Sequence, residues 1–396
     1  MGPVVRREDD VELPKRRCVV HHPAMTPTQR LSASLTPLDV ALSALLQGLA
    51  PVVPIELRLA EAMGCVAAEM PALEAHPPHD IAAVDGWALR ARDLVGASSY
   101  SPLALALPPI WVDAGDAMPK GCDCVLDSDS VDQTGPMVQV LAEAVPGQGV
   151  RRAGDDIAAG AVVVAAGHRV RPRHLMMARV AGMERLLVRR PRLRIVNIPS
   201  RGVGVTAHLI AESARKAGAA VVGVEAAGRD AASIAKALDA DGCDLLVTVG
   251  GSGVGRTDAM VTALALRGEI IAHGLALQPG RTCAVARIGN RPVIALPGAP
   301  DQAFAAWWTL ALPVLDRLSG RRPRKSLRLP LARKIASAVG IAEIVLLERK
   351  QDAWHTLATG DLSLEAIARA EAWLLVPGDS EGFAAGAPVD GYMLRD

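Results

Sequence analysis

Four short apolar runs alternate with stretches of helical periodicity between residues 190 and 320. The runs cover residues 193–198, 220–224, 245–249 and 293–296. Such runs are typical of strands buried on both faces, as in a parallel sheet covered by helices. Those helices are expected near residues 206–217, 230–240, 257–267 and 302–318. The pattern therefore predicts an open α/β domain, whose ligands bind at the carboxyl ends of the strands.

The pattern is different on both sides of this region. Thr36, Pro37 and Asp39 form a helix start signal, and residues 174–181 predict a further helix. Elsewhere short β-like runs lie between proline- and glycine-rich turns. The predicted fold class is therefore an α/β and β multidomain chain. Its expected parts are a flexible tail (1–34), a helical linking domain (35–60 and 147–189), a mostly β module (61–146), the open α/β domain (190–322) and a C-terminal β domain (323–396).

Composition excludes several classes of protein. The 396 residues carry a formal net charge of only +1, which gives no general attraction to nucleic acid or membrane surfaces. No apolar run approaches the length of a transmembrane helix. The six cysteines are scattered, which is typical of reduced thiols in a cytoplasmic protein. We therefore expect a cytoplasmic protein without nucleic-acid or membrane partners.

A glycine-rich loop after residues 245–249 is the strongest chemical signal. It contains Gly250, Gly251, Ser252, Gly253, Gly255 and then Asp258. Closely spaced glycines allow backbone N–H groups to converge on a phosphate or similar oxyanion, with support from a following helix N-terminus. The spacing matches neither a phosphate loop nor a dinucleotide fingerprint. The alternative is a tight turn that binds nothing.

Two other loops are candidates for the same ligand. Pro297, Gly298 and Pro300 follow the run 293–296, so they are expected at the same edge of the sheet. Pro279, Gly280 and Arg281 add a cation, and an arginine pairs bidentately with oxyanions. A surface arginine is the plainer interpretation of Arg281.

Four aspartates could hold Mg²⁺, which takes few protein carboxylates and shares its other positions with water and phosphate. They are Asp85, Asp156, Asp230 and Asp258. Each also has a plain interpretation: Asp85 and Asp156 as turn residues, Asp230 and Asp258 as helix caps.

The ordered set of motifs resembles the molybdopterin molybdotransferase family, which includes the gephyrin E domain. The resemblance covers about residues 36–390. Its motifs are Asp85-Gly86-Trp87-Ala88, Gly154-Asp155-Asp156-Ile157, the glycine loop through Asp258, Pro279-Gly280-Arg281 and Leu296-Pro297-Gly298 with Pro300.

This resemblance implies an L-shaped, four-domain subunit in a homodimer, with the α/β domain of one subunit facing the β module of the other. It implies a reaction of adenylylated molybdopterin with molybdate, assisted by Mg²⁺ and releasing AMP. By motif match, Asp85, Asp156 and Asp258 would be catalytic, and the same three with Asp230 would surround the metal. The glycine, Pro279–Arg281 and Pro297–Pro300 loops would bind the pterin or molybdate.

The chain also departs from the family pattern. After residues 193–198 the family has two acids, whereas this chain has Ser200 and Arg201. The family's lysine and asparagine are replaced by Gln278 and Ala299, and its threonine by Ala114. Losing metal ligands removes Lewis-acid assistance, whereas Arg201 could neutralise phosphate directly.

Three functions follow as hypotheses. The first is an active molybdotransferase. The second is a degenerate paralogue that binds molybdopterin or its molybdenum-loaded form as a carrier or maturation partner of a molybdoenzyme. The third, a nucleotide-dependent oxidoreductase, is disfavoured because the glycine spacing is wrong.

Overall fold

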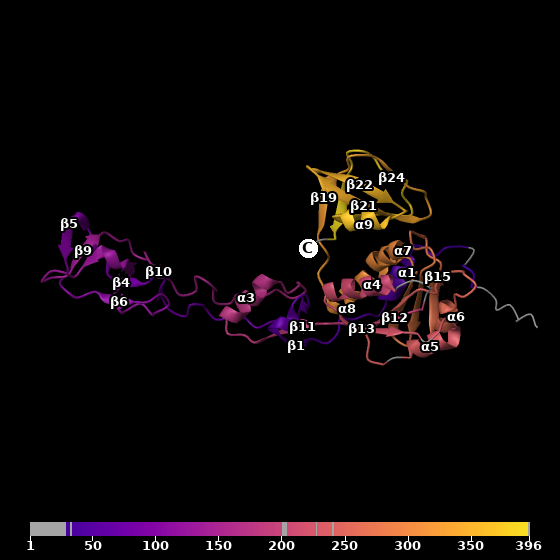
Figure 1. The fold of residues 1–396 in the computed structure, drawn as a ribbon, viewed down its shortest axis with the longest axis horizontal. Helices are drawn as coiled ribbons and strands as arrows, with labels where there is room; N and C mark the ends of the chain where they lie inside the picture. The colour runs from indigo at the N-terminus through magenta and orange to yellow at the C-terminus, as the bar shows by residue number, and fades with distance from the viewer. Residues whose placement is uncertain (1–28, 32–33, 200–203, 227, 240, 395–396) are drawn as a thin grey trace, which may run out of the picture.

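The computed structural model describes residues 29–31, 34–199, 204–226, 228–239 and 241–394. The chain is elongated, with a β-rich arm at one end and an α/β domain beside a C-terminal β domain at the other (Figure 1). This arrangement confirms the predicted fold class.

The α/β domain is built on a six-stranded sheet in the order β13-β12-β14-β18-β17-β15. Its strands are β12 (Arg192–Asn197), β13 (Ala220–Glu225), β14 (Leu245–Val249), β15 (Glu269–His273), β17 (Ala284–Ile288) and β18 (Arg291–Leu296). The first four strands in the sheet order are parallel, and all five residues of β14 are buried, as expected of a central strand. The pair β17 and β15 is antiparallel and was not predicted.

Helices cover both faces of this sheet. They are α1 (Leu38–Leu46), α4 (Val205–Lys216), α5 (Ala231–Leu238), α6 (Met260–Ala265), α7 (Pro300–Ala306), the π-helical turn η3 (Trp307–Ala311) and α8 (Leu312–Ser319). One core joins the first face to α1, α4 and α7 through α8, and a second core joins the other face to α5 and α6.

The position of α1 differs from the expected division of the chain. We expected residues 35–60 in the linking domain, but Leu38, Ala41 and Leu45 are buried in the core of the α/β domain. Helical periodicity predicts an apolar face and does not identify the surface that covers it.

The arm has two parts. Its root contains β1 (Ile55–Arg58), α2 (Leu59–Ala62), β2 (Val66–Ala67), α3 (Pro172–Val180) and β11 (Arg185–Arg189). Its tip contains β3 (Ile81–Ala82), β4 (Gly86–Leu89), η1 (Ala91–Leu94), β5 (Ser98–Ala104), β6 (Ile110–Val112), β7 (Cys124–Leu126), η2 (Ser128–Ser130), β8 (Val131–Asp132), β9 (Gln139–Ala142) and β10 (Val150–Arg151). The pairing of β3 with β10 brings the two ends of the tip together.

The C-terminal domain is built on a second sheet, whose strands are mainly antiparallel. Its elements are β19 (Ser326–Pro330), β20 (Ile335–Ala336), β21 (Ala342–Lys350), β22 (Ala353–Thr359), α9 (Leu364–Arg369), β23 (Ala372–Val376), β24 (Gly382–Phe383) and β25 (Pro388–Met393). The strand β16 (Leu277–Gln278) comes from the α/β region and pairs in parallel with β21. This pairing joins the two domains directly before Pro279.

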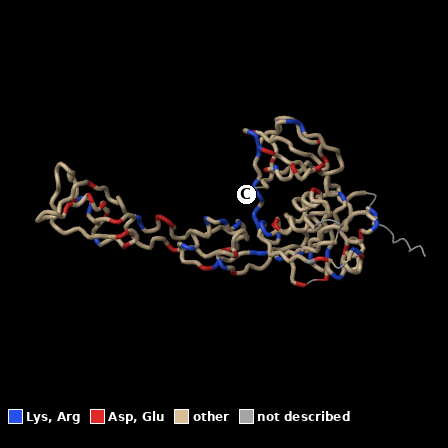
Figure 2. Tube along the Cα trace, in the orientation of Figure 1, with Lys and Arg blue, Asp and Glu red and all other residues tan. Residues whose placement is uncertain are grey.

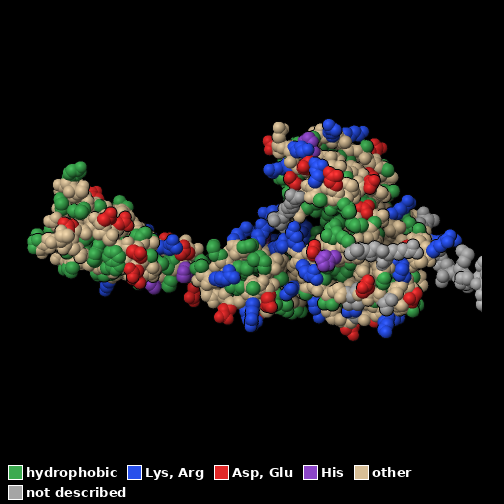
Figure 3. Space-filling view, viewed as in Figure 1, with side chains coloured by type: hydrophobic (Ala, Val, Ile, Leu, Met, Phe, Trp, Pro, Cys, Tyr) green, Lys and Arg blue, Asp and Glu red, His purple; other side chains and the backbone are tan. Residues whose placement is uncertain are grey.

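Charge is distributed unevenly along the molecule. Acidic residues outnumber basic ones in the tip (Figure 2), whereas Lys and Arg gather where the root meets the other domains (Figure 3). Arg171, Arg173, Arg322 and Lys325 line a hollow at that junction. The near-zero net charge therefore hides an acidic tip and a basic patch at the junction of the root with the other domains. Within the described residues, every helix is too short or too polar to span a bilayer.

Candidate functional site

The glycine loop leaves β14 at the carboxyl edge of the parallel strands, as predicted. Gly250 and Gly251 have φ angles of 91° and 72°, in the left-handed region that favours glycine. The Gly250 N–H donates to the carbonyl of Leu296 (2.9 Å). Within the described chain, the N–H groups of Gly251, Ser252 and Gly253 have no hydrogen-bond acceptor. Of these, the amides of Gly251 and Gly253 belong to residues that line a pocket, so they are available to an anion.

The expected helix support for this loop is weaker than predicted. The helix was expected from residue 257, but α6 begins at Met260 and has only six residues. The backbone amides of the loop, rather than a long helix dipole, therefore supply the partial positive charge.

A pocket of about 290 Å³ lies between this loop and the end of β18. The two loops meet closely, because a Cβ added at Gly298 would lie 3.6 Å from the Cα of Gly250. The Thr206 hydroxyl donates to the Gly298 carbonyl (2.7 Å) and holds the second loop against α4. The lining residues are Asn197, Ile198, Gly204, Thr206, Ala207, Arg229, Val249, Gly250, Gly251, Gly253, Asp258, Thr282, Pro297, Gly298, Ala299 and Gln302.

Only some of the predicted ligand residues line this pocket. Those that do are Gly250, Gly251, Gly253, Asp258, Pro297 and Gly298. Ser252 and Pro300 do not line it: the Ser252 side chain is fully buried, and Pro300 is the first residue of α7. Pro279 and Gly280 are buried at the junction with the C-terminal domain, Arg281 beside them is exposed, and Gly255 is exposed but does not line the pocket. Arg201 lies outside the described residues.

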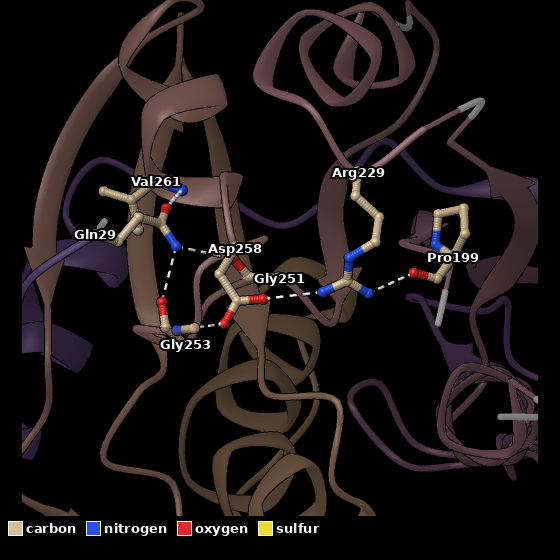
Figure 4. Close-up of polar contacts among 8 residues, drawn as sticks. Gln29, Pro199, Arg229, Gly251, Gly253, Asp258 and Val261 are labelled. Atoms are coloured by element: carbon tan, nitrogen blue, oxygen red, sulfur yellow. Dashed lines mark hydrogen bonds and ion pairs between the residues drawn. The ribbon is translucent and has the colours of Figure 1, made fainter. Parts of the chain in front are cut away.

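Asp258 is held in place by two donors (Figure 4). Its Oδ1 accepts a hydrogen bond from Arg229 Nη2 (3.0 Å), and its Oδ2 accepts one from the N–H of Gly255 (3.0 Å). The Asp258 side chain is 17% exposed and that of Arg229 is 35% exposed, so the ion pair is largely shielded from water. Arg229 also donates to the carbonyl of Pro199.

The glycine loop is also fastened from the N-terminal segment (Figure 4). Gln29 Nε2 donates to the carbonyls of Gly251 (3.1 Å) and Gly253 (2.8 Å), and Gln29 Oε1 accepts from the N–H of Val261 (2.6 Å). The predicted flexible tail, residues 1–34, therefore contains at least one residue that belongs to the site. Residues 1–28 and 32–33 lie outside the described part of the chain.

We expect Gln29→Ala to loosen the loop, because three hydrogen bonds are lost together. The expected loss is about 1–3 kcal/mol of local stability. The measurement is amide hydrogen exchange at Val261, which should accelerate, with Gln133→Ala in the distant tip as the control. Unchanged exchange at Val261 would show that the contact does not stabilise the loop.

The other three predicted aspartates are not at the pocket. Asp85 lies in the tip, where its carboxylate accepts from the N–H of Ala114 (2.7 Å). Asp156 pairs with Arg151 (3.1 Å) in the same part of the arm. Figure 1 shows this part far from the α/β domain. Asp230 is the N-cap of α5 and accepts from the N–H of Ser233 (2.9 Å), and hydrogen bonding to Ser233 lowers the pKa of its carboxyl.

The residues of one chain do not fit a Mg²⁺ site. Among the described residues, no three His, Cys, Asp or Glu side chains converge as metal ligands. Of the described residues that line the pocket, Asp258 is the one carboxylate, and both of its oxygens accept hydrogen bonds. The predicted metal set of four aspartates therefore does not assemble within a single chain.

Sequence reasoning missed Arg229, Thr206 and Gln29. Arg229 follows β13, so it belongs to the same carboxyl edge as the glycine loop, and this position was the available signal. The pairing of Gln29 with Gly251 and Gly253 spans more than 200 residues and leaves no local pattern.

Fold and site together define a multidomain protein whose α/β domain presents a glycine-rich loop with free backbone amides at the carboxyl edge of its parallel strands. Comparison with known proteins identifies the class further. Residues 36–182 match the MoeA N-terminal region (domain I and II), and residues 180–317 match a probable molybdopterin binding domain.

Relatives with assigned names agree. Molybdopterin molybdenumtransferase 2 of Mycobacterium tuberculosis is 30% identical over 319 residues, covering 69% of this chain and 78% of the relative. A putative molybdopterin biosynthesis protein of Methanocaldococcus jannaschii is 24% identical over 379 residues, covering 86% and 92%. The crystal structure of a molybdopterin biosynthesis MoeA protein from Pyrococcus horikoshii has the same fold, with a TM-score of 0.69, 24% identity and coverage of 91% and 100%.

The chain belongs to the MoeA family of molybdopterin molybdenumtransferases. The family predicted from the sequence motifs is thereby confirmed.

Proposed function

We propose that this chain is a molybdopterin molybdenumtransferase, which inserts molybdate into adenylylated molybdopterin and releases AMP in the cytoplasm. One observation carries the proposal. A pocket of about 290 Å³ at the carboxyl edge of the sheet combines the two free loop amides of Gly251 and Gly253 with Arg229, and this combination suits a phosphorylated ligand.

The proposed active site lies between two copies of the chain. Asp85 and Asp156 belong to the acidic tip, and they cannot reach the pocket of their own α/β domain (Figure 1). In a twofold homodimer, the tip of one copy reaches the α/β domain of the other, and both sites form by the same contact. The tip would then add the carboxylates of Asp85 and Asp156 to a pocket whose described lining holds one carboxylate, Asp258.

The residues of the α/β domain have separate roles in this proposal. The amides of Gly251 and Gly253 bind the phosphate that joins the pterin to AMP. Arg229 neutralises its charge, and Asp258 orients Arg229 through the 3.0 Å ion pair. Gly298, held by Thr206, forms the opposite wall. A phosphate held by fixed donors in a partly enclosed site is well placed for cleavage.

The test is AMP release from adenylylated molybdopterin on adding molybdate, measured with Mg²⁺ and in EDTA. Release that depends on molybdate supports the transferase. Pterin binding without AMP release above background would remove the transferase and favour the carrier function, in which the chain delivers its ligand to a molybdoenzyme. The missing carboxylates of the pocket are the observation that keeps the carrier as the second candidate.

A further inference from the structure

We infer that Arg229 takes the place of a divalent cation, so that this pocket binds the phosphate of its ligand without a metal. The inference rests on the proposed function, since it assumes a phosphate-bearing ligand. It concerns how the charge of that ligand is balanced, and it holds or fails independently of whether the chain transfers molybdenum.

Both oxygens of the Asp258 carboxylate accept hydrogen bonds from the protein. A magnesium ligand needs a carboxylate oxygen directed at the metal. In this pocket Asp258 Oδ1 is bound to Arg229 at 3.0 Å and Oδ2 to the N–H of Gly255 at 3.0 Å. No other Asp or Glu is among the described residues that line the pocket.

The glycine loop passes so close to the Asp258 carboxylate that two of its positions have no room for a side chain. A Cβ added at Gly253 would lie 2.6 Å from Asp258 Oδ2, and one added at Gly255 would lie 2.9 Å from it. Both distances are too short for a real side chain. The two glycines therefore leave the space that lets the carboxylate turn toward Arg229.

Arg229 has more hydrogen-bond donors than its contacts within the protein use. A guanidinium has five N–H donors and stays charged at every physiological pH. Arg229 uses one donor group on Asp258 and another on Pro199, while its Nε is buried without an acceptor among the described residues. Because the side chain lines the pocket and is 35% exposed, the remaining N–H donors of its two Nη groups are available to a ligand there.

These features give Arg229 the charge and direction that a phosphate needs. Guanidinium groups bind phosphate oxygens through paired, charge-assisted hydrogen bonds. Asp258 then acts as a positioning residue for Arg229. A metal brought to the pocket by the partner's carboxylates is the competing arrangement, and the experiment below separates the two.

The experiment measures AMP binding to the full chain by calorimetry, in excess Mg²⁺ and in EDTA. We expect the wild-type Kd to change by less than about twofold between the two conditions, because the charge is balanced by Arg229. Arg229→Ala should weaken binding by about tenfold to a hundredfold in both conditions. Arg267→Ala is the matched control, since Arg267 pairs with Asp239 (2.5 Å) on the same domain but outside the pocket.

A second variant tests the exchange of charge directly. Arg229→Asp places two carboxylates in the pocket, and AMP binding by this variant should become dependent on Mg²⁺. Wild-type binding that is lost in EDTA, or that is absent in both conditions, would overturn the inference. Metal-independent AMP binding without AMP release in the transfer assay would support the inference and remove the proposed transferase.

Discussion

Mixing two inactive variants, Asp85→Asn and Asp258→Asn, is expected to restore about a quarter of the wild-type rate of AMP release. Each variant alone should lose roughly a hundredfold or more, because each removes a charged group from the proposed site. In the proposed twofold dimer each site would take Asp85 from one copy and Asp258 from the other. Random exchange gives mixed dimers in about half of the molecules, and one of the two sites in each is intact.

The control for this experiment is a pair of changes on the same side of the site. Arg229→Ala and Asp258→Asn both lie on the α/β domain, 3.0 Å apart. A mixed dimer of these two has one defect in each site, so their mixture should stay inactive. Recovery by the Arg229 and Asp258 mixture, or no recovery by the Asp85 and Asp258 mixture, would contradict a site shared between two copies.

The parallel strands were predictable from sequence because burial on both faces leaves continuous apolar runs. All five residues of β14 are buried, and its run was recognised without any structure. The antiparallel strands β15 and β17 were missed, because their short apolar runs contain Glu269, His273 and Arg287 and resemble loop sequence. The positions of the candidate ligand loops were predictable for a related reason. Each apolar run predicts where its strand ends, and the loop that follows lies at the carboxyl edge of the sheet.

The aspartates show the limit of this reasoning. From the sequence alone, Asp230 could be either a helix cap or a metal ligand. The hydrogen bond that its carboxylate accepts from the Ser233 N–H shows that it caps the helix. For Asp258 the deciding partner is Arg229, 29 positions away, and for the glycine loop it is Gln29. Contacts of this range depend on the path of the whole chain, which no local pattern contains.

The Trp354→Ala variant is expected to lose much of the stability of the C-terminal domain. Trp354 is fully buried in the core of the C-terminal domain, and its Nε1 donates to the Leu327 carbonyl (3.2 Å). The ring also fills the space left by Gly391, where an added Cβ would lie 2.7 Å from it. Truncating a buried tryptophan typically costs about 3–5 kcal/mol, and here it also leaves a carbonyl without its donor.

Denaturant unfolding followed by circular dichroism is the measurement for Trp354→Ala. We expect the C-terminal domain to unfold first, in a separate early transition, because domains of one chain need not unfold together. Trp111→Ala is the matched control: Trp111 is 45% exposed in the tip, so its removal should cost much less. The β16–β21 pairing lies at the junction that holds Pro279, so AMP binding measured below the early transition should persist and above it should weaken. Equal losses of stability in the two variants would show that Trp354 does not hold this domain together.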